Sequence, residues 1–222
     1  MTSRLLPRTA LAAVLLAVAP VCAGCADTAA PPEASTGPTV STAEALPTDA
    51  RGVERLLVDE VPSGLPRVPD DDLDPPAGEK TVDDVAGYGE DAERQQQVLS
   101  EYGYLRGWER FWRDGPRITS VFLDQFDGPD GAVVYAEDLA RNDAEYYGGT
   151  LDRSPAGLPE DCVLMAVPEA LPEHGMEGPP AFAWCTRGAF TVAVASVQTT
   201  AEEARAELSA VVIDQLDRLP AG

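Results

Sequence analysis

The sequence predicts a single α+β domain, an antiparallel sheet with helices packed on it, that follows a signal peptide and a disordered tether. Three observations predict this. Segments typical of strands and helices occur in the order strand, strand, helix, strand, strand, strand, helix. Short turns connect neighbouring strands, as in antiparallel hairpins. Residues 51–222 are long enough for one hydrophobic core and too short for two to be expected.

The first two strands are predicted from an aromatic segment and a β-branched segment that a turn connects. Residues 102–113 contain five aromatic residues and two glycines, a composition that favours a strand. Asp114-Gly115-Pro116 provides the turn, and residues 118–126 are rich in β-branched and aromatic side chains. The large apolar residues of the first segment would also fit one face of a helix, so that alternative stays open.

A helix is predicted to follow this hairpin. Asp127 is expected to be its N-cap, since a carboxylate there can accept hydrogen bonds from free backbone amides, and Asp130 suits the first turn. The expected buried stripe is Val133, Ala136, Leu139 and Ala140. Upstream of the hairpin, residues 92–99 also fit a helix, whereas two glycines interrupt the residues before them.

Three more strands and a final helix complete the predicted domain. The strands are expected at residues 162–167, 181–186 and 190–197, and the last two form the clearest hairpin in the chain. Thr200 and Glu203 have the spacing of a capping box, which predicts a helix start. The residues that follow at helical spacing are Ala204, Leu208, Val211, Val212 and Leu216.

The first residues of the chain have the layout of a secretory signal peptide. Arg4 and Arg8 precede an uncharged, largely apolar run over residues 9–24. This run is shorter than the roughly 20 apolar residues that cross a bilayer, and Pro20 lies near its end, which argues against a permanent transmembrane helix. Residues 1–24 are therefore predicted to be removed from the mature protein.

The end of this run, Val21-Cys22-Ala23-Gly24-Cys25, resembles the lipobox of bacterial lipoproteins. Ala23 and Gly24 match the pattern, whereas Cys22 stands where an aliphatic residue is usual. The resemblance implies cleavage after Gly24, a diacylglyceryl group on the Cys25 thiol, and an address on the outer face of the cell membrane. Two or three acyl chains would make this anchor stable. The alternative is an ordinary secretory signal without a lipid.

Residues 25–50 are predicted to be the lipidated cysteine and a disordered tether. Their composition, mainly Thr, Ala, Pro, Ser and Glu, cannot bury enough apolar surface to fold. A flexible chain of this length would hold the domain roughly 25–30 Å from the membrane.

The charge of the chain limits its partners. The net charge is −22, and it becomes −24 when residues 1–24 are removed, because they contain two arginines and no acid. Such a surface repels nucleic acid and anionic lipid head groups, so neither is expected to bind the folded domain. Lys80 is the only lysine beside fifteen arginines, a bias of GC-rich genomes that points to an actinobacterial source.

The remaining cysteines predict one disulfide bond. After lipidation of Cys25, the mature chain retains Cys162 and Cys185, an even pair in an oxidising compartment. Both lie in apolar segments expected to be strands. A disulfide between them is predicted, and a redox role is not, since they form no Cys-x-x-Cys motif.

No catalytic, cofactor or metal site is predicted. His174 is the only histidine and lies in a segment rich in proline and glycine, where an exposed loop residue is expected. The nucleophile turn of hydrolases, a zinc ligand set and phosphate-binding motifs are absent from the sequence. Acids at Asp124, Asp127 and Asp130, and the group at residues 70–74, supply oxygen ligands but lack the spacing of a calcium loop.

The most concentrated group of aromatic and basic residues lies in residues 102–113. Two interpretations stay open for Arg106, Trp108, Arg110 and Trp112. They form either part of the sheet core, with the arginines paired to acids, or a ligand surface for a glycan or peptide, because aromatic faces stack on sugars and guanidinium groups bind carboxylates.

The whole arrangement of lipobox, tether and one acidic domain resembles the small cell-envelope lipoproteins of actinobacteria. The resemblance implies a membrane-anchored, extracytoplasmic protein, and the function we expect is a non-enzymatic binding or sensing module for an unknown envelope ligand or protein. Two alternatives are an envelope hydrolase that uses a carboxylate pair, and a carrier of a lipid or other hydrophobic ligand.

Overall fold

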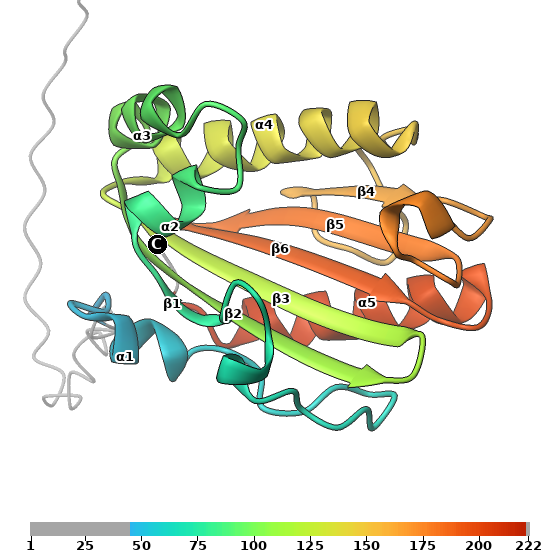
Figure 1. Ribbon diagram of the computed structural model, residues 1–222. Coiled ribbons are helices and arrows are strands. Elements are labelled where there is room, and N and C mark those ends of the chain that lie inside the picture. The colour runs from blue at the N-terminus through green and yellow to red at the C-terminus, as the bar shows by residue number, and fades with distance from the viewer. Residues whose placement is uncertain (1–44, 221–222) are drawn as a thin grey trace, which may run out of the picture. The chain divides into compact units, whose positions relative to one another are not determined.

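A computed structural model describes residues 45–220, which form one unit around a six-stranded sheet (Figure 1). The strands are β1 (Gly78–Lys80), β2 (Tyr104–Asp114), β3 (Arg117–Phe126), β4 (Cys162–Ala166), β5 (Pro180–Arg187) and β6 (Phe190–Val197). Their order across the sheet is β1-β2-β3-β6-β5-β4, and every neighbouring pair is antiparallel. The predicted signal peptide, the lipobox with Cys25 and the predicted tether up to residue 44 lie outside the described residues.

Helices cover both faces of the sheet. They are α1 (Ala50–Glu54), α2 (Val82–Ala86), α3 (Ala92–Glu101), α4 (Pro129–Tyr147) and α5 (Ala201–Asp217), with 3-10 turns at Asp70–Asp72 and Pro172–His174. α5 packs on β5 and β6 from one face, and α4 packs on the same strands from the other face (Figure 1). The predicted class, an antiparallel sheet with helices packed on it, is confirmed. Within residues 45–220, no helix is long and apolar enough to cross a bilayer.

The face of the sheet under α5 is the main hydrophobic core. α5 begins at the predicted capping box, where the Thr200 hydroxyl and the Glu203 carboxylate each accept the other residue's backbone amide. The predicted stripe of α5 is buried in full: Ala204, Leu208, Val211, Val212 and Leu216. Gln215 of α5 also accepts a hydrogen bond from Val58 N and donates one to Leu56 O, so it ties the segment after α1 to this core.

The predicted disulfide bond joins two neighbouring strands on this face. Cys162 of β4 lies directly opposite Cys185 of β5, with 4.1 Å between their Cα atoms. Both side chains are buried in the α5 core. The prediction of this pair is confirmed.

The face of the sheet under α4 is packed through small side chains. The buried residues of α4 are Ala132, Ala136 and Ala140. The prediction that Val133 is buried was wrong, because the buried stripe begins one residue earlier and Val133 is 52% exposed. The prediction that Asp127 is the N-cap was also wrong. Gly128 holds that position without a side-chain hydrogen bond, and Pro129 begins the helix because its fixed φ suits the first turn.

The N-terminal end of the domain begins before the expected boundary at residue 51. Asp49 is the N-cap of α1 and accepts a hydrogen bond from Gly52 N at 2.7 Å. Pro47 O accepts a hydrogen bond from Gln125 Nε2 of β3 at 2.9 Å. The last residues of the predicted tether are therefore part of the folded domain. The short elements α1, β1 and α2 were not predicted.

Candidate functional site

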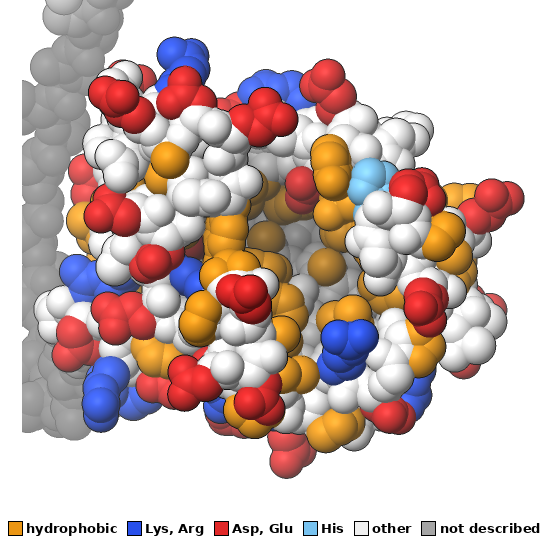
Figure 2. Space-filling view, viewed as in Figure 1, with side chains coloured by type: hydrophobic (Ala, Val, Ile, Leu, Met, Phe, Trp, Pro, Cys, Tyr) orange, Lys and Arg blue, Asp and Glu red, His pale blue; other side chains and the backbone are white. Residues whose placement is uncertain are grey.

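A cleft of about 360 Å³ opens on the α4 face of the sheet, beside the helix and over parts of β3 and β6. Figure 2 shows this hollow in the middle of the face, with apolar side chains at its base and rim. Its floor is made of alternate residues of the central strands: Ile118, Ser120 and Phe122 of β3, and Ala193, Ala195 and Val197 of β6. Antiparallel pairing puts these residues on one face because opposite residues point to the same side.

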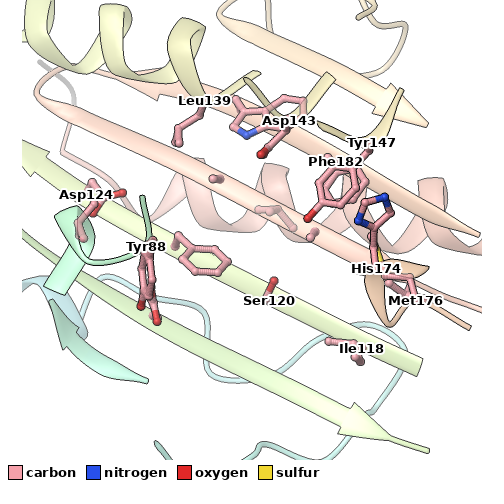
Figure 3. Close-up of a pocket in the computed structure, with 18 of the residues that line it drawn as sticks. Tyr88, Ile118, Ser120, Asp124, Leu139, Asp143, Tyr147, His174, Met176 and Phe182 are labelled. Carbon is pink, nitrogen blue, oxygen red and sulfur yellow. The ribbon is translucent and has the colours of Figure 1, made fainter. Parts of the chain in front are cut away.

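Four separate parts of the chain form the walls of the cleft. α4 contributes Leu139, Asp143 and Tyr147, and β5 contributes Phe182 and Trp184. Other wall residues are Val85 of α2 and Tyr88 just after it, and His174 and Met176 around the second 3-10 turn. Figure 3 shows that the side chains of Tyr88, Asp143 and His174 approach the same space from different sides. The site is therefore apolar and largely aromatic, with a few ionisable groups.

A buried ion pair lies beneath one end of the cleft. Lys80 Nζ is 3.2 Å from Glu109 Oε2, and both residues are almost completely buried. The Tyr88 hydroxyl donates a 2.7 Å hydrogen bond to Glu109 Oε1. Burial and this carboxylate raise the pKa of Tyr88. Burial raises the pKa of Glu109, and the hydrogen bonds from Tyr88 and Lys80 oppose that shift. Glu109 is thus held by two partners, and Tyr88 is fixed as part of the wall.

Asp124 is a second buried carboxyl group in the same end of the cleft. It lies opposite Gly107 in the β2–β3 register, where a Cβ atom would collide with its carboxylate and with the Tyr104 hydroxyl. Tyr104 donates a hydrogen bond to Asp124 Oδ1 at 3.1 Å. Burial raises the pKa of Asp124 to about 7, and Glu109 adds to the shift. Gly107 therefore makes the space that this carboxyl group occupies.

Asp143 lies on the opposite wall, on the inner side of α4. Burial raises its pKa to about 6, while a hydrogen bond from the Trp184 side chain opposes the shift. It precedes Tyr147 by one helical turn, so both side chains share the face of α4 that borders the cleft. Asp143 is half-buried and points into the cleft (Figure 3).

His174 is part of the cleft wall, and the expectation of an exposed loop residue was wrong. Its side chain is 19% exposed, and its ring lies 4.7 Å from the ring of Tyr146 and 5.0 Å from that of Tyr147. Two backbone hydrogen bonds between Leu171 and Met176 close the loop that contains His174. In this closed loop the histidine lies near the end of α4. Proline and glycine predicted the loop, but its long-range contacts were not visible in the sequence.

The aromatic and arginine group of β2 lies on the other face of the sheet, away from the cleft. Trp112 is 1% exposed within the α5 core, and Trp108 packs partly buried against the same core. Arg110 is 3% exposed, donates a hydrogen bond to Val58 O at 2.6 Å and lies 3.1 Å from Asp59 Oδ1. Trp112 and Arg110 are therefore part of the sheet core, the first of the two interpretations left open by the sequence, because alternate residues of β2 from Arg106 to Trp112 face this core.

The acidic groups noted in the sequence are separated by the fold. Asp124 is buried beside Tyr104, whereas Asp127 and Asp130 are exposed near the start of α4. Asp70 is paired with Arg67 at 3.0 Å. Within the part of the chain that the structure describes, no group of three or more His, Cys, Asp or Glu residues is arranged to hold a metal ion.

The sequence contained signals for some of the missed cleft residues. Lys80, the only lysine of the chain, is buried in the ion pair with Glu109, whereas the sequence alone indicated only a codon bias. Gly107 and Asp124 lie in strand segments that were correctly predicted, so a polar residue inside an apolar strand was a visible exception. No local pattern connects Asp143 or Tyr147 with β5.

Comparison with known proteins assigns this chain to no family. No protein-family model matches it, and no curated protein matches it. Among solved structures, the fold is similar to the extracellular domain of PknH from Mycobacterium tuberculosis, with a TM-score of 0.45 and 11% sequence identity. The similarity covers 78% of this chain and 98% of that chain. At this level of similarity the comparison assigns neither a family nor a function.

Proposed function

We propose that the protein is a non-enzymatic binding or sensing module of the cell envelope, anchored through a lipid on Cys25, and that the cleft is its ligand site. The observation that carries the proposal is the apolar cleft on the part of the sheet that α4 leaves uncovered. Small-molecule sites are commonly concave, have volumes of about 300–1,000 Å³, and combine aromatic walls with a few polar groups. The cleft has each of these properties.

Two features support a position outside the cytoplasm. The Cys162–Cys185 disulfide bond is of a kind that persists in oxidising compartments. The signal-like segment and the lipobox precede the domain in the sequence. Together they favour a domain that is displayed on the outer side of the membrane, where it meets envelope or external molecules.

Filling the cleft tests its role directly. Residues 26–222, produced without the signal peptide, should enhance the emission of a neutral environment-sensitive dye such as Nile red. Ala195→Trp places an indole on the floor of the cleft and should abolish the enhancement. Ala210→Trp adds the same side chain to the exposed side of α5 and is the matched control. Equal emission from both variants would show that the dye binds elsewhere and would refute the assignment of the cleft.

The lipid anchor needs a separate test in cells. The full-length protein should be recovered in the membrane fraction and labelled by radioactive palmitate, whereas Cys25→Ala should lose both properties. Cys22→Ala, three residues away, should retain them and serves as the control. Persistent labelling of Cys25→Ala would contradict the assignment.

A second candidate function, an envelope hydrolase, is favoured by Asp124. Its pKa of about 7 is the property that a general acid needs near neutral pH, and Glu109 lies close enough to influence it. Hydrolysis of peptidoglycan or of a glycan that Asp124→Asn abolishes would support this candidate and refute the non-enzymatic function. Absence of turnover by the wild-type domain, under conditions in which it binds ligand, would support the binding module.

A further inference from the structure

Three aromatic rings form a continuous stack along one wall of the cleft. The rings of Tyr147 and Phe182 are 4.9 Å apart and 14° from parallel, and those of Phe182 and Trp184 are 6.0 Å apart and 9° from parallel. His174 closes the outer end of this stack, 5.0 Å from Tyr147. All four residues line the cleft. Aromatic faces carry partial negative charge, so a wall of this kind attracts cations as well as apolar groups.

The carboxylate of Asp143 lies against this stack. It lies close enough to the Trp184 side chain for that group to lower its pKa, and it shares the inner face of α4 with Tyr147. With a pKa of about 6, it is ionised at pH 7.5. A half-buried negative charge beside aromatic rings is a pairing that positive ligands use.

The described lining of the cleft supplies no arginine or lysine to neutralise Asp143. The lining contains three acids, Glu109, Asp124 and Asp143, together with His174. The nearby Lys80 is already engaged by Glu109 and by Pro76 O. With a net charge of −22 on the chain, a fatty acid, a phosphate or another anion would meet repulsion in this cleft.

We propose that the cleft binds an amphipathic organic cation, whose ammonium group lies between Asp143 and the ring of Tyr147 and whose apolar part covers the floor formed by β3 and β6. This inference rests on the proposed function, since it names the ligand class of the same cleft. Asp143 supplies the charge, and the ring stack supplies both the apolar surface and the cation–π contact.

Three probes that share an octyl group and differ in their head groups test the proposal. They are octyltrimethylammonium, octanol and octyl sulfate, each titrated calorimetrically below its micelle concentration into residues 26–222 at pH 7.5. We expect the cation to bind about tenfold more tightly than octanol, and octyl sulfate to bind more weakly than both. Asp143→Asn should remove the preference for the cation and leave the affinity for octanol unchanged.

Two further variants separate a local effect from a general charge effect. Asp217→Asn removes the same charge from the exposed end of α5 and should keep the full preference. Tyr147→Leu keeps an apolar side chain but removes an aromatic face, and should weaken binding of the cation more than binding of octanol. Equal losses of preference in Asp143→Asn and Asp217→Asn would overturn the role of Asp143.

The outcomes also distinguish this inference from the proposed function. If octanol and the cation bind equally well to the wild-type domain, the cation inference fails, while the cleft remains a binding site of the kind expected for a hydrophobe carrier. If none of the probes binds and Nile red shows no enhancement, both the ligand class and the proposed function of the cleft fail.

Discussion

Alternate side chains of the same strands build both faces of the sheet, yet the two faces differ in what covers them. On the α5 face, strand residues such as Trp112, Leu123 and Val192 are buried beneath α5 and the segment after α1. On the opposite face, α4 packs on β5 and on part of β6, and the cleft leaves β3 and the rest of β6 uncovered. One face is a closed core and the other is a core that is left incomplete.

The two faces also differ in the kind of polar side chain that they bury. Buried polar side chains of the α5 face, such as Arg110 and Gln215, donate hydrogen bonds to backbone oxygens of the segment after α1, although Arg110 Nε has no partner among the described residues. The cleft face carries Asp124 and Asp143, whose pKa values are raised because burial disfavours their charged forms. Burying a carboxyl group near neutral pH destabilises a fold, and such groups are concentrated at functional sites. The cleft face therefore carries buried carboxyl groups with raised pKa values, a property that agrees with its proposed role as a ligand site.

The largest difference between the faces should appear when one large aromatic residue is removed from each. Trp112→Ala leaves a cavity in the closed core and should lower the free energy of unfolding by about 3–5 kcal/mol. Phe122→Ala removes a half-buried ring from the cleft floor and should lower it by about 1–2 kcal/mol. Urea denaturation of the two variants measures both values. Equal losses would mean that the cleft face is packed as tightly as the core.

The pH dependence of stability should carry the signature of Asp124. Its pKa is about 7 in the folded protein and 3.8 as a model value, so the native state holds this proton more tightly than the unfolded chain. Its contribution to stability is therefore present below about pH 4 and is lost as the pH rises through 7, by up to about 4 kcal/mol. Asp124→Asn should lose much less stability across this range than the wild type.

Unfolding free energies at pH 5 and pH 8 measure that effect. The raised pKa of Glu109 has the same sign, so some loss of stability with pH should remain in Asp124→Asn. Asp217→Asn, on the far side of α5, should keep the slope of the wild type. The same slope in Asp124→Asn and the wild type would show that this carboxyl group is not buried as a neutral acid.

The disulfide bond should stabilise the closed face without changing the cleft. Replacing Cys162 and Cys185 by alanine releases a cross-link over 23 residues and should lower the free energy of unfolding by about 3 kcal/mol. Dithiothreitol should destabilise the wild type by a similar amount and leave the double variant unaffected. Nile red emission should be unchanged, and its loss would show that the closed face also supports the cleft.

The smallest change in the free energy of unfolding is expected for N-cap variants, and it should differ between the starts of α5 and α4. Thr200→Ala removes the hydroxyl of a formed capping box and should cost about 1 kcal/mol. Asp127→Ala, the matched change before α4, should alter stability very little, because Gly128 is the N-cap there and no side-chain cap is formed. Thermal melting of both variants checks the difference, and a large loss in Asp127→Ala would restore it as a cap.

Local patterns were sufficient for most of the architecture. The hairpin from β5 to β6, the capping box at Thr200 and the buried stripe of α5 were predicted because each depends on residues that are close in sequence. The pairing of Cys162 with Cys185 was predicted because the chain offers one pair after lipidation. The short elements α1 and β1 were missed, since five and three residues give too little periodicity to detect.

Tertiary structure alone decided which face of the sheet is open and what lies there. The alternation along β2 predicts that Trp112 and Glu109 point to opposite sides, but it does not say which side a helix will cover. The cleft also depends on contacts between distant segments, such as Lys80 with Glu109 and Asp143 with Trp184. These contacts arise because strand order and helix packing bring remote residues together, and one sequence taken locally carries no information about that order.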